Sequence, residues 1–154
     1  MSLSKRTTRP LDHLVLPVDT LTQARRRLSD LGFTVADDAR HPFGTENACV
    51  FFADGTYLEP LAIASREECE AAALDGNAFV ARDQAFRFRQ GPEGLSALVF
   101  GTEDAASDHI RFRACGISGG DMLEFSRPMK LPDGREGLGS FRLAFAADLR
   151  APDL

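Results

Sequence analysis

The sequence predicts an α+β fold made of two tandem β-α-β-β-β modules, the second of which lacks its last strand. The first observation is an internal repeat: residues 11–33 and 95–117 align without gaps, with apolar residues at matching positions and a glycine near each end. The second is that strand-like segments follow each copy, separated by turn signals. A chain of 154 residues is long enough for one such domain.

Each copy of the repeat predicts a buried strand followed by a helix, because its apolar residues first run together and then recur every three or four positions. Matching strand positions include Leu14 with Leu98 and Val15 with Val99. Capping residues and glycines mark the ends of both helices. They are Asp19 or Thr20 and Gly32 in the first copy, and Glu103 or Asp104 and Gly116 in the second.

The segments after the first copy predict three further strands. Asp54 and Gly55 join two of them in a hairpin, since both residue types tolerate the positive φ angles of a tight turn. The first module is therefore β-α-β-β-β. Its predicted segments are a short strand at 33–37, a loop at 41–47, and hairpin strands at 47–53 and 56–63.

The second module is shorter than the first. Strands are predicted at 121–131 and 140–147, joined by a turn at 132–134 and a hairpin loop at 134–139, and the sequence ends where a fourth strand is due. A helical connector that breaks near Asp75-Gly76 lies between the modules. The chain thus divides into a tail (1–10), a first module (11–64), the connector (65–93) and a shortened second module (94–154), which together form one domain.

The composition excludes several classes of function. A net charge of −5 argues against nucleic-acid and membrane partners, which call for a basic footprint. No apolar run approaches the roughly 20 residues of a membrane-spanning helix, and the basic N-terminus is not followed by the apolar segment of a secretory signal. The three cysteines have no metal-binding spacing. We therefore expect a cytoplasmic protein with reduced thiols.

Three short segments resemble the vicinal oxygen chelate superfamily, which includes glyoxalase I, bleomycin-resistance proteins and extradiol dioxygenases. The pattern is most similar to the glyoxalase-like domain branch. The resemblance implies curved mixed sheets around a cleft that binds a small organic molecule. Members that use a metal take ligands from the first and the last strand of each module. The three segments are Leu11-Asp12-His13, the loop from His41 to Asn47, and the hairpin from Asp54 to Glu59.

His13 and Glu59 are the candidate catalytic residues. Strand alternation places His13 with Val15 on one face of its strand, and Glu59 with Tyr57 on one face of another. The resemblance implies that both point into the cleft, as acid–base groups or as two ligands of a divalent metal such as Zn, Ni, Mn or Fe. The alternative interpretation is a hydrogen-bonded or ionic pair that only satisfies two buried polar groups.

The metal site implied by the resemblance is incomplete. Ala97 stands where His13 stands in the first copy of the repeat, and alanine cannot bind a metal. The second carboxylate belongs to the fourth strand that the second module lacks. Because two protein ligands hold a metal weakly, water, the substrate or another subunit would have to complete the coordination.

Four further residues are candidates for substrate binding: His41, Thr45, Asn47 and Tyr57. Polar groups on loops of a rigid sheet are common ligand-binding positions. The alternative for Thr45 and Asn47 is that they hydrogen-bond their own turn.

Two hypotheses of function follow. One is a glyoxalase-like enzyme, a metal-dependent lyase, isomerase or dioxygenase that acts on a small organic molecule in the cleft. The other is a metal-free protein that sequesters an apolar or aromatic compound, which the missing ligand at Ala97 favours. Three explanations of the missing strand remain open: the sequence is a truncated chain, a partner chain supplies the strand or covers the open edge, or the module closes early. We expect a homodimer with the open edge or the mouth of the cleft near its interface.

Overall fold

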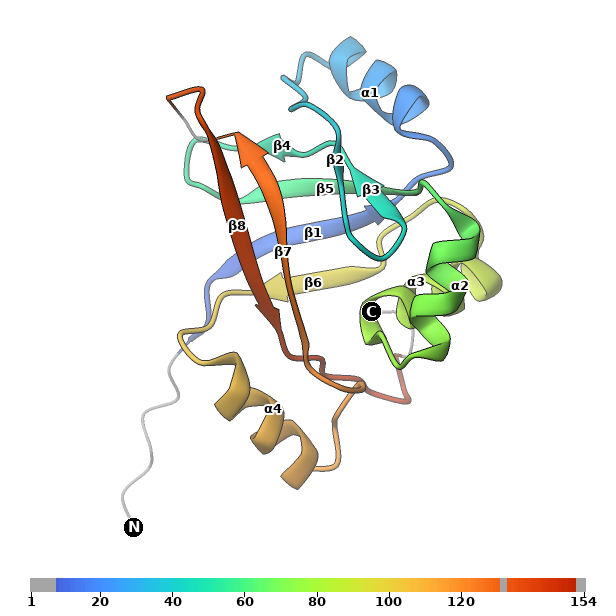
Figure 1. The fold of residues 1–154 in the computed structure, drawn as a ribbon, viewed down its shortest axis with the longest axis vertical. Coiled ribbons are helices and arrows are strands. Elements are labelled where there is room, and N and C mark those ends of the chain that lie inside the picture. The colour runs from blue at the N-terminus through green and yellow to red at the C-terminus, as the bar shows by residue number, and fades with distance from the viewer. Residues whose placement is uncertain (1–7, 131–132, 152–154) are drawn as a thin grey trace.

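The computed structural model describes residues 8–130 and 133–151, which form the predicted mixture of helices and curved mixed sheets (Figure 1). The larger sheet consists of β1 (Leu11–Pro17), β2 (Ala39–Arg40), β3 (Thr45–Asn47), β4 (Val50–Phe51), β5 (Tyr57–Ile63) and β6 (Ala97–Phe100). The smaller sheet is a hairpin of β7 (Leu123–Lys130) and β8 (Glu136–Leu143). The helices are α1 (Leu21–Asp30), α2 (Arg66–Leu74), α3 (Ala78–Gln90) and α4 (Ala105–Ala114).

The two modules share the larger sheet. β1 pairs in parallel with β5 on one side and antiparallel with β6 on the other. Since β6 is the first strand of the second repeat, the second module adds a strand to the sheet of the first. The rest of its sheet is the two-stranded hairpin, which crosses in front of the larger sheet in Figure 1. No helix of the described ranges is long and apolar enough to span a membrane.

Pro60 interrupts one ladder of the larger sheet. β3 and β4 pair with the two ends of β5, with Asn47 opposite Leu61 and Val50 opposite Leu58. The register is the same on both sides of the gap between β3 and β4. Pro60 lies opposite this gap and has no N–H to donate. The ladder of backbone hydrogen bonds is therefore interrupted, and the extended segment forms two short strands, β3 and β4.

Three segment predictions are wrong at the level of single elements. Residues 33–37 are not a strand, because the Arg25 guanidinium takes the carbonyl groups of Val35 and Ala36 as hydrogen-bond acceptors. Residues 45–47, expected in a loop, form β3 because they pair with the C-terminal half of β5. The strand predicted at 140–147 is shifted, because β8 pairs with β7 from Glu136, inside the expected loop, and ends at Leu143.

The two repeat helices begin and end in the same way, as predicted. Thr20 caps α1 and Asp104 caps α4, each accepting a hydrogen bond from the N–H three residues on. Gly32 and Gly116 follow the C-termini with φ angles of 93° and 69°. The connector is helical and breaks where expected, with Gly76 between α2 and α3.

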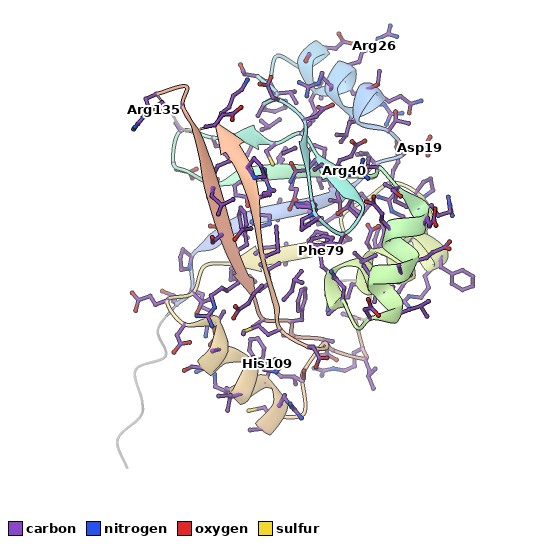
Figure 2. The ribbon with its side chains drawn as sticks, viewed as in Figure 1. Asp19, Arg26, Arg40, Phe79, His109 and Arg135 are labelled. Atoms are coloured by element: carbon purple, nitrogen blue, oxygen red, sulfur yellow. The ribbon has the colours of Figure 1, made fainter. Side chains whose placement is uncertain are left out.

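Phe43 joins three parts of the molecule. It packs against Cys69 of α2 and Val80 of α3, and this cluster also includes Phe125 of the hairpin. Figure 2 shows Phe79 of α3 between the connector helices and the hairpin, where its ring centroid lies 5.4 Å from that of Phe43. The loop that carries Phe43 is therefore fixed from both sides.

The homodimer expected from the open sheet edge stays a prediction. The edge expected for it is that of β8, the last strand of the second module, which in the described residues pairs only with β7. β6 forms a further open edge, on one side of the larger sheet. Its side chains Leu98 and Phe100, which alternate with Ala97 and Val99, are exposed. An exposed apolar patch at a sheet edge is a surface that a second copy can cover.

Gly44 holds the loop of His41 against α2. It has a φ of +98°, and a Cβ at this position would lie 2.8 Å from both the amide nitrogen of Cys69 and the carbonyl oxygen of Ser65. Its carbonyl accepts hydrogen bonds from the N–H groups of Ala64 and Ser65. Only glycine satisfies both the backbone conformation and the close approach.

We expect Gly44→Ala to destabilise the protein more than Gly55→Ala. Gly55 has a similar φ of +88° but no atom within 4 Å of the added Cβ, so alanine there costs only the strained backbone, about 1–2 kcal/mol. At Gly44 the overpacking adds about 1–3 kcal/mol. Urea unfolding of both variants measures the difference, and equal losses would show that the contact with α2 does not constrain the loop.

Candidate functional site

The register of the larger sheet brings the predicted polar side chains onto one face. Parallel pairing sets His13 of β1 beside Tyr57 of β5, and their rings stack with centroids 4.3 Å apart. Glu59, two residues further along β5, returns to the same face. Thr45 and Asn47 of β3 pair with β5 on its other side and share this face. Residues from three strands therefore converge beneath the hairpin.

His13 and Glu59 form a buried pair. Nε2 of His13 lies 3.2 Å from Oε2 of Glu59, and Nδ1 of His13 lies 2.7 Å from Oδ2 of Asp12. Burial alone would lower the pKa of His13, but the hydrogen bond and charge of Glu59, with those of Asp12, raise it. Burial alone would raise the pKa of Glu59, but the hydrogen bond and charge of His13 lower it. Each residue thus favours the charged form of the other.

His41 lies on the other side of Glu59. Its Nδ1 is 2.8 Å from Oγ1 of Thr45, and its Nε2 is 3.4 Å from Nδ2 of Asn47 and 3.7 Å from Oε1 of Glu59. Nδ2 of Asn47 also donates to Oε1 of Glu59 at 2.8 Å. Because the amide is a donor, Nε2 of His41 accepts, and the proton of the neutral imidazole is assigned to Nδ1, which donates to Thr45.

Aromatic rings surround His41. Phe43 stacks on it at 5.1 Å between centroids, and Phe79 and Phe125 meet it edge-on at 5.5 and 5.6 Å. Burial lowers the pKa of His41 to about 4, and the charge of Arg127 on β7 pushes in the same direction. Although the charge of Glu59 pushes the pKa upward, it does not offset the burial. His41 therefore stays neutral at pH values near 6.5, at which a histidine of the unfolded chain takes up a proton.

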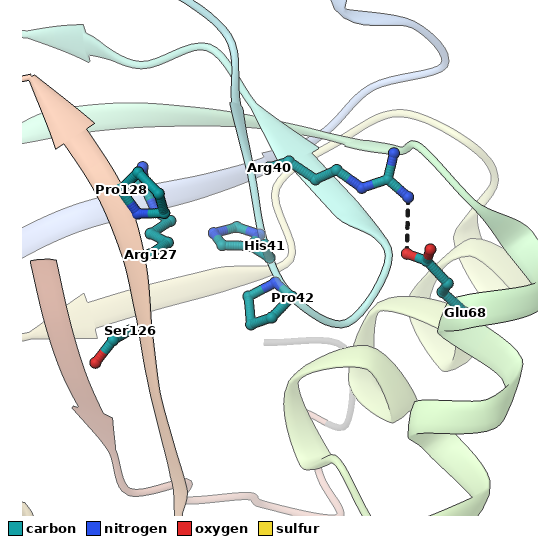
Figure 3. A pocket seen from close by; sticks show the side chains of 7 residues that line it. All are labelled: Arg40, His41, Pro42, Glu68, Ser126, Arg127 and Pro128. Atoms are coloured by element: carbon teal, nitrogen blue, oxygen red, sulfur yellow. Dashed lines mark hydrogen bonds and ion pairs between the residues drawn. The ribbon is translucent and has the colours of Figure 1, made fainter. Parts of the chain in front are cut away.

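A pocket of about 320 Å³ opens beside this network (Figure 3). His41 belongs to both, so a chain of polar groups runs from the pocket through His41, Glu59 and His13 to Asp12. The Asp12 side chain is 49% exposed and connects this chain to solvent. The pocket is lined by Arg40, His41, Pro42, Glu68, Ser126, Arg127 and Pro128.

The six residues singled out from the sequence lie together in this network. Thr45 is fully buried, and both it and Asn47 bond to side chains of the network as well as to their own segment. Sequence reasoning missed Arg127 and the phenylalanines around His41. Alternation along β7 puts Phe125 and Arg127 on one face, but only the placement of the hairpin shows that this face meets the larger sheet.

The side chains at this site do not make a metal centre by themselves. His13 and Glu59 are the donors expected from the sequence, and Oε1 of Glu59 is already bonded to Asn47. Ala97 of β6 pairs with Val15 beside them and offers no donor atom. Within residues 8–130 and 133–151, no group of three or more His, Cys, Asp or Glu side chains has an arrangement that could hold a metal ion.

Comparison with protein families gives one match, to a model described as a glyoxalase-like domain, over residues 11–154. None of the curated proteins matches the sequence.

Solved structures of the same fold have low sequence identity to the chain. Methylmalonyl-CoA epimerase from Mycobacterium tuberculosis has a TM-score of 0.55 and 15% identity, over 97% of this chain and 96% of that one. A hypothetical protein from Bacillus halodurans has a TM-score of 0.54 and 17% identity, over 84% and 82%. A hypothetical protein from Staphylococcus aureus has a TM-score of 0.62 and 15% identity, over 92% of this chain but only 54% of its own.

We expect His41 to weaken the fold as the pH falls from above 6.5 toward 4. Its pKa of 6.5 in the unfolded chain drops to about 4 in the folded one, so between these values only the unfolded state takes up the proton. Stability is therefore lost toward acid, by about 3 kcal/mol at most. Urea unfolding at several pH values should give a flatter curve for His41→Gln than for the wild type.

Thr45→Val is the matched control for this measurement. It removes the hydrogen bond between Thr45 and His41 but keeps the imidazole. This variant should lose stability at every pH, but its free energy of unfolding should change with pH as steeply as that of the wild type. If His41→Gln retains that slope as well, the buried imidazole is not its source.

Proposed function

Because the chain belongs to the family of glyoxalase-like domains, within the vicinal oxygen chelate superfamily, we propose that it binds a small organic molecule between β7 and the larger sheet and moves a proton on it. The observation that carries this proposal is the buried pair of His13 and Glu59. Apolar residues of similar volume would stabilise a core as well or better, because charges are costly to bury. A pair retained here points to chemistry.

Glu59 is the proposed base and His13 the proposed acid. The carboxylate of Glu59 takes a proton from a carbon next to a carbonyl group, and the electron pair of that C–H bond moves onto the carbonyl oxygen. The imidazolium of His13 stabilises the resulting enolate and, through Asp12, exchanges protons with solvent. The proton then returns to the carbon, which leaves an isomer or the starting compound.

The other predicted residues support this pair. Asn47 fixes one oxygen of Glu59, and Thr45 fixes the tautomer of His41, so we propose that both act by positioning. Tyr57 stacks on His13 and holds its ring plane. Burial raises the pKa of Tyr57, so its hydroxyl keeps its proton and can donate to a bound carbonyl.

The hairpin is the part that can admit a ligand to this pair. His13 and Glu59 are only 8% and 5% exposed. Among the described residues, β7 and β8 pair with each other and with no strand of the larger sheet. The hairpin can therefore shift over the sheet without breaking a ladder of backbone hydrogen bonds. The fold similarity to a methylmalonyl-CoA epimerase makes isomerisation a reasonable reaction class, by analogy of fold only.

A second candidate is a metal-free protein that sequesters an aromatic or apolar compound. The observation in its favour is the ring of phenylalanines around His41 together with Ala97 in place of a second histidine. In this case the pair of His13 and Glu59 orients the ligand through hydrogen bonds and transfers no proton.

Solvent deuterium exchange separates the two candidates. In D₂O, small carbonyl compounds that bind should exchange the hydrogen next to the carbonyl group, as followed by NMR. Glu59→Gln should slow this exchange by about 10²- to 10⁴-fold, the usual contribution of a general base. Glu46→Gln is the control, since Glu46 lies on β3 next to Asn47 and points to the opposite face. A compound that raises the melting temperature without any exchange in the wild type supports sequestration instead.

Metal loading tests the metal-dependent version of the enzyme. Because the described side chains give at most His13 and Glu59 as ligands, we expect less than one Zn, Ni, Mn or Fe(II) per chain after loading. Elemental analysis and thermal unfolding with each metal measure this, since a tightly bound metal raises the stability. One equivalent of metal that disappears in Glu59→Gln would contradict the expectation and restore the metal site.

A further inference from the structure

Arg127 is a half-buried cation of the cleft whose Nε the structure leaves without a hydrogen-bond partner among the described residues. Its Nε is buried and makes no hydrogen bond in the described part of the chain. No carboxylate of those residues forms an ion pair with it, although exposed arginines of the same hairpin, such as Arg142 with Glu124, are paired. Leaving a buried donor unsatisfied costs free energy, so such a group calls for an explanation.

The position of Arg127 is built by the hairpin. Its guanidinium lies over the ring of Phe141, with Cζ 5.4 Å from the ring centroid. Gly139, directly across from Arg127 in the ladder, is buried, and a Cβ there would lie 2.8 Å from Sδ of Met129 and 3.1 Å from the ring of Phe141. The glycine therefore leaves the room in which the ring of Phe141 supports the guanidinium.

Arg127 also lines the pocket, on the wall that faces His41 (Figure 3). The other cation of the pocket wall, Arg40, is neutralised by Glu68 at 2.7 Å. His41 is neutral, and His13 and Glu59 balance each other. Among the described residues, Arg127 is thus the cation of the pocket wall that no carboxylate neutralises.

We infer that Arg127 binds the carboxylate of a compact monoanionic ligand. A guanidinium presents two parallel N–H donors to a carboxylate, and a single uncompensated charge suits one carboxylate better than a phosphate dianion. The volume of about 320 Å³ is at the lower end of ligand pockets, which run from about 300 to 1,000 Å³. The size of the pocket suits a small carboxylic acid.

This inference rests on the proposed function and specifies its substrate class. With the carboxylate held at Arg127, the rest of the ligand extends past His41 toward Glu59, along the polar chain of the site. Pro42 and Pro128 of the pocket wall contact its apolar part. A carboxylic acid with a carbonyl group or an acidic C–H bond close to the carboxylate meets both requirements.

A set of acids tested beside their methyl esters examines this directly. Acetate, pyruvate, benzoate and phenylpyruvate, each with its methyl ester and with inorganic phosphate as a further anion, are titrated by ligand-observed NMR and thermal shift. We expect at least one acid to bind at least about 10-fold more tightly than its ester, the effect of one charged hydrogen-bonded contact. Arg127→Met should weaken that acid by about 10- to 100-fold and leave the ester unchanged.

Two variants keep the result interpretable. Arg142→Met removes an exposed arginine from the same hairpin and should bind the acid like the wild type. Without ligand, Arg127→Met should melt at the wild-type temperature or above, because it removes a half-buried cation whose Nε is buried without a hydrogen bond; a merely structural arginine would give a lower melting temperature. If Arg127→Met does not fold, Arg127→Lys replaces it and should retain the charge but weaken the acid through loss of the paired donors.

The outcomes separate this inference from the proposed function. If esters bind as tightly as acids, or Arg127→Met binds the acid like the wild type, the inference is wrong while binding of a small molecule stands. Tighter binding of phosphate than of any carboxylate also overturns it. If neither the acids nor the esters bind, both the inference and the proposed function fail.

Discussion

The parallel pairing of β1 with β5 is the constraint on which the site depends. Its register sets His13 beside Tyr57 and places Glu59 two residues further along β5, on the same face. A shift by one residue would turn Glu59 to the opposite face, where Leu58 and Pro60 now lie, and leave His13 without its partner. The pairing of β5 with β3 and of β1 with β6 then determines which residues surround His13 and Glu59.

Successive hydrogen bonds along the polar network offset the free energy that burial of its polar side chains costs. Asp12 bonds to His13, His13 to Glu59, and Asn47 to both Glu59 and His41, so each carboxylate and imidazole has a partner. His13 and Glu59 each shift the pKa of the other toward the charged form, and burial among aromatic rings lowers the pKa of His41 to about 4. Arg127 is the exception, since its partner is not among the described residues.

Local sequence signals predicted the first module well. The repeat predicted the strand and helix of each module, and alternation along two strands placed His13 with Val15 and Glu59 with Tyr57. That these two faces meet was implied only by the family resemblance. Boundaries failed where one distant residue overrides local propensity. Arg25 takes the carbonyl groups of a segment that otherwise favours a strand as hydrogen-bond acceptors, and Pro60 of β5 interrupts the pairing of an earlier segment, which forms β3 and β4 instead of one strand.

The parts of the site that the sequence did not predict depend on how the hairpin and connector pack against the sheet. Phe79, Phe125 and Arg127 meet His41 from α3 and β7, across long stretches of chain. No periodicity in one segment can show which face of a distant hairpin covers the sheet. Contacts between such distant residues can be found only from a structure or from an alignment in which the two positions co-vary.

The two copies of the repeat are alike in fold but differ in chemistry. Both begin with a strand and a helix, and each helix has a capping side chain at its start and a glycine after its end. Ala97 nevertheless stands where the first copy has His13. The second copy instead brings its hairpin over the first sheet, with Phe125 against His41 and Arg127 at the pocket. A symmetric pair of modules would place equivalent ligands around one centre. Here the first module supplies His13, Glu59 and His41, and the second supplies the hairpin that covers them, with Arg127 at the pocket. The two modules therefore contribute different groups to one site.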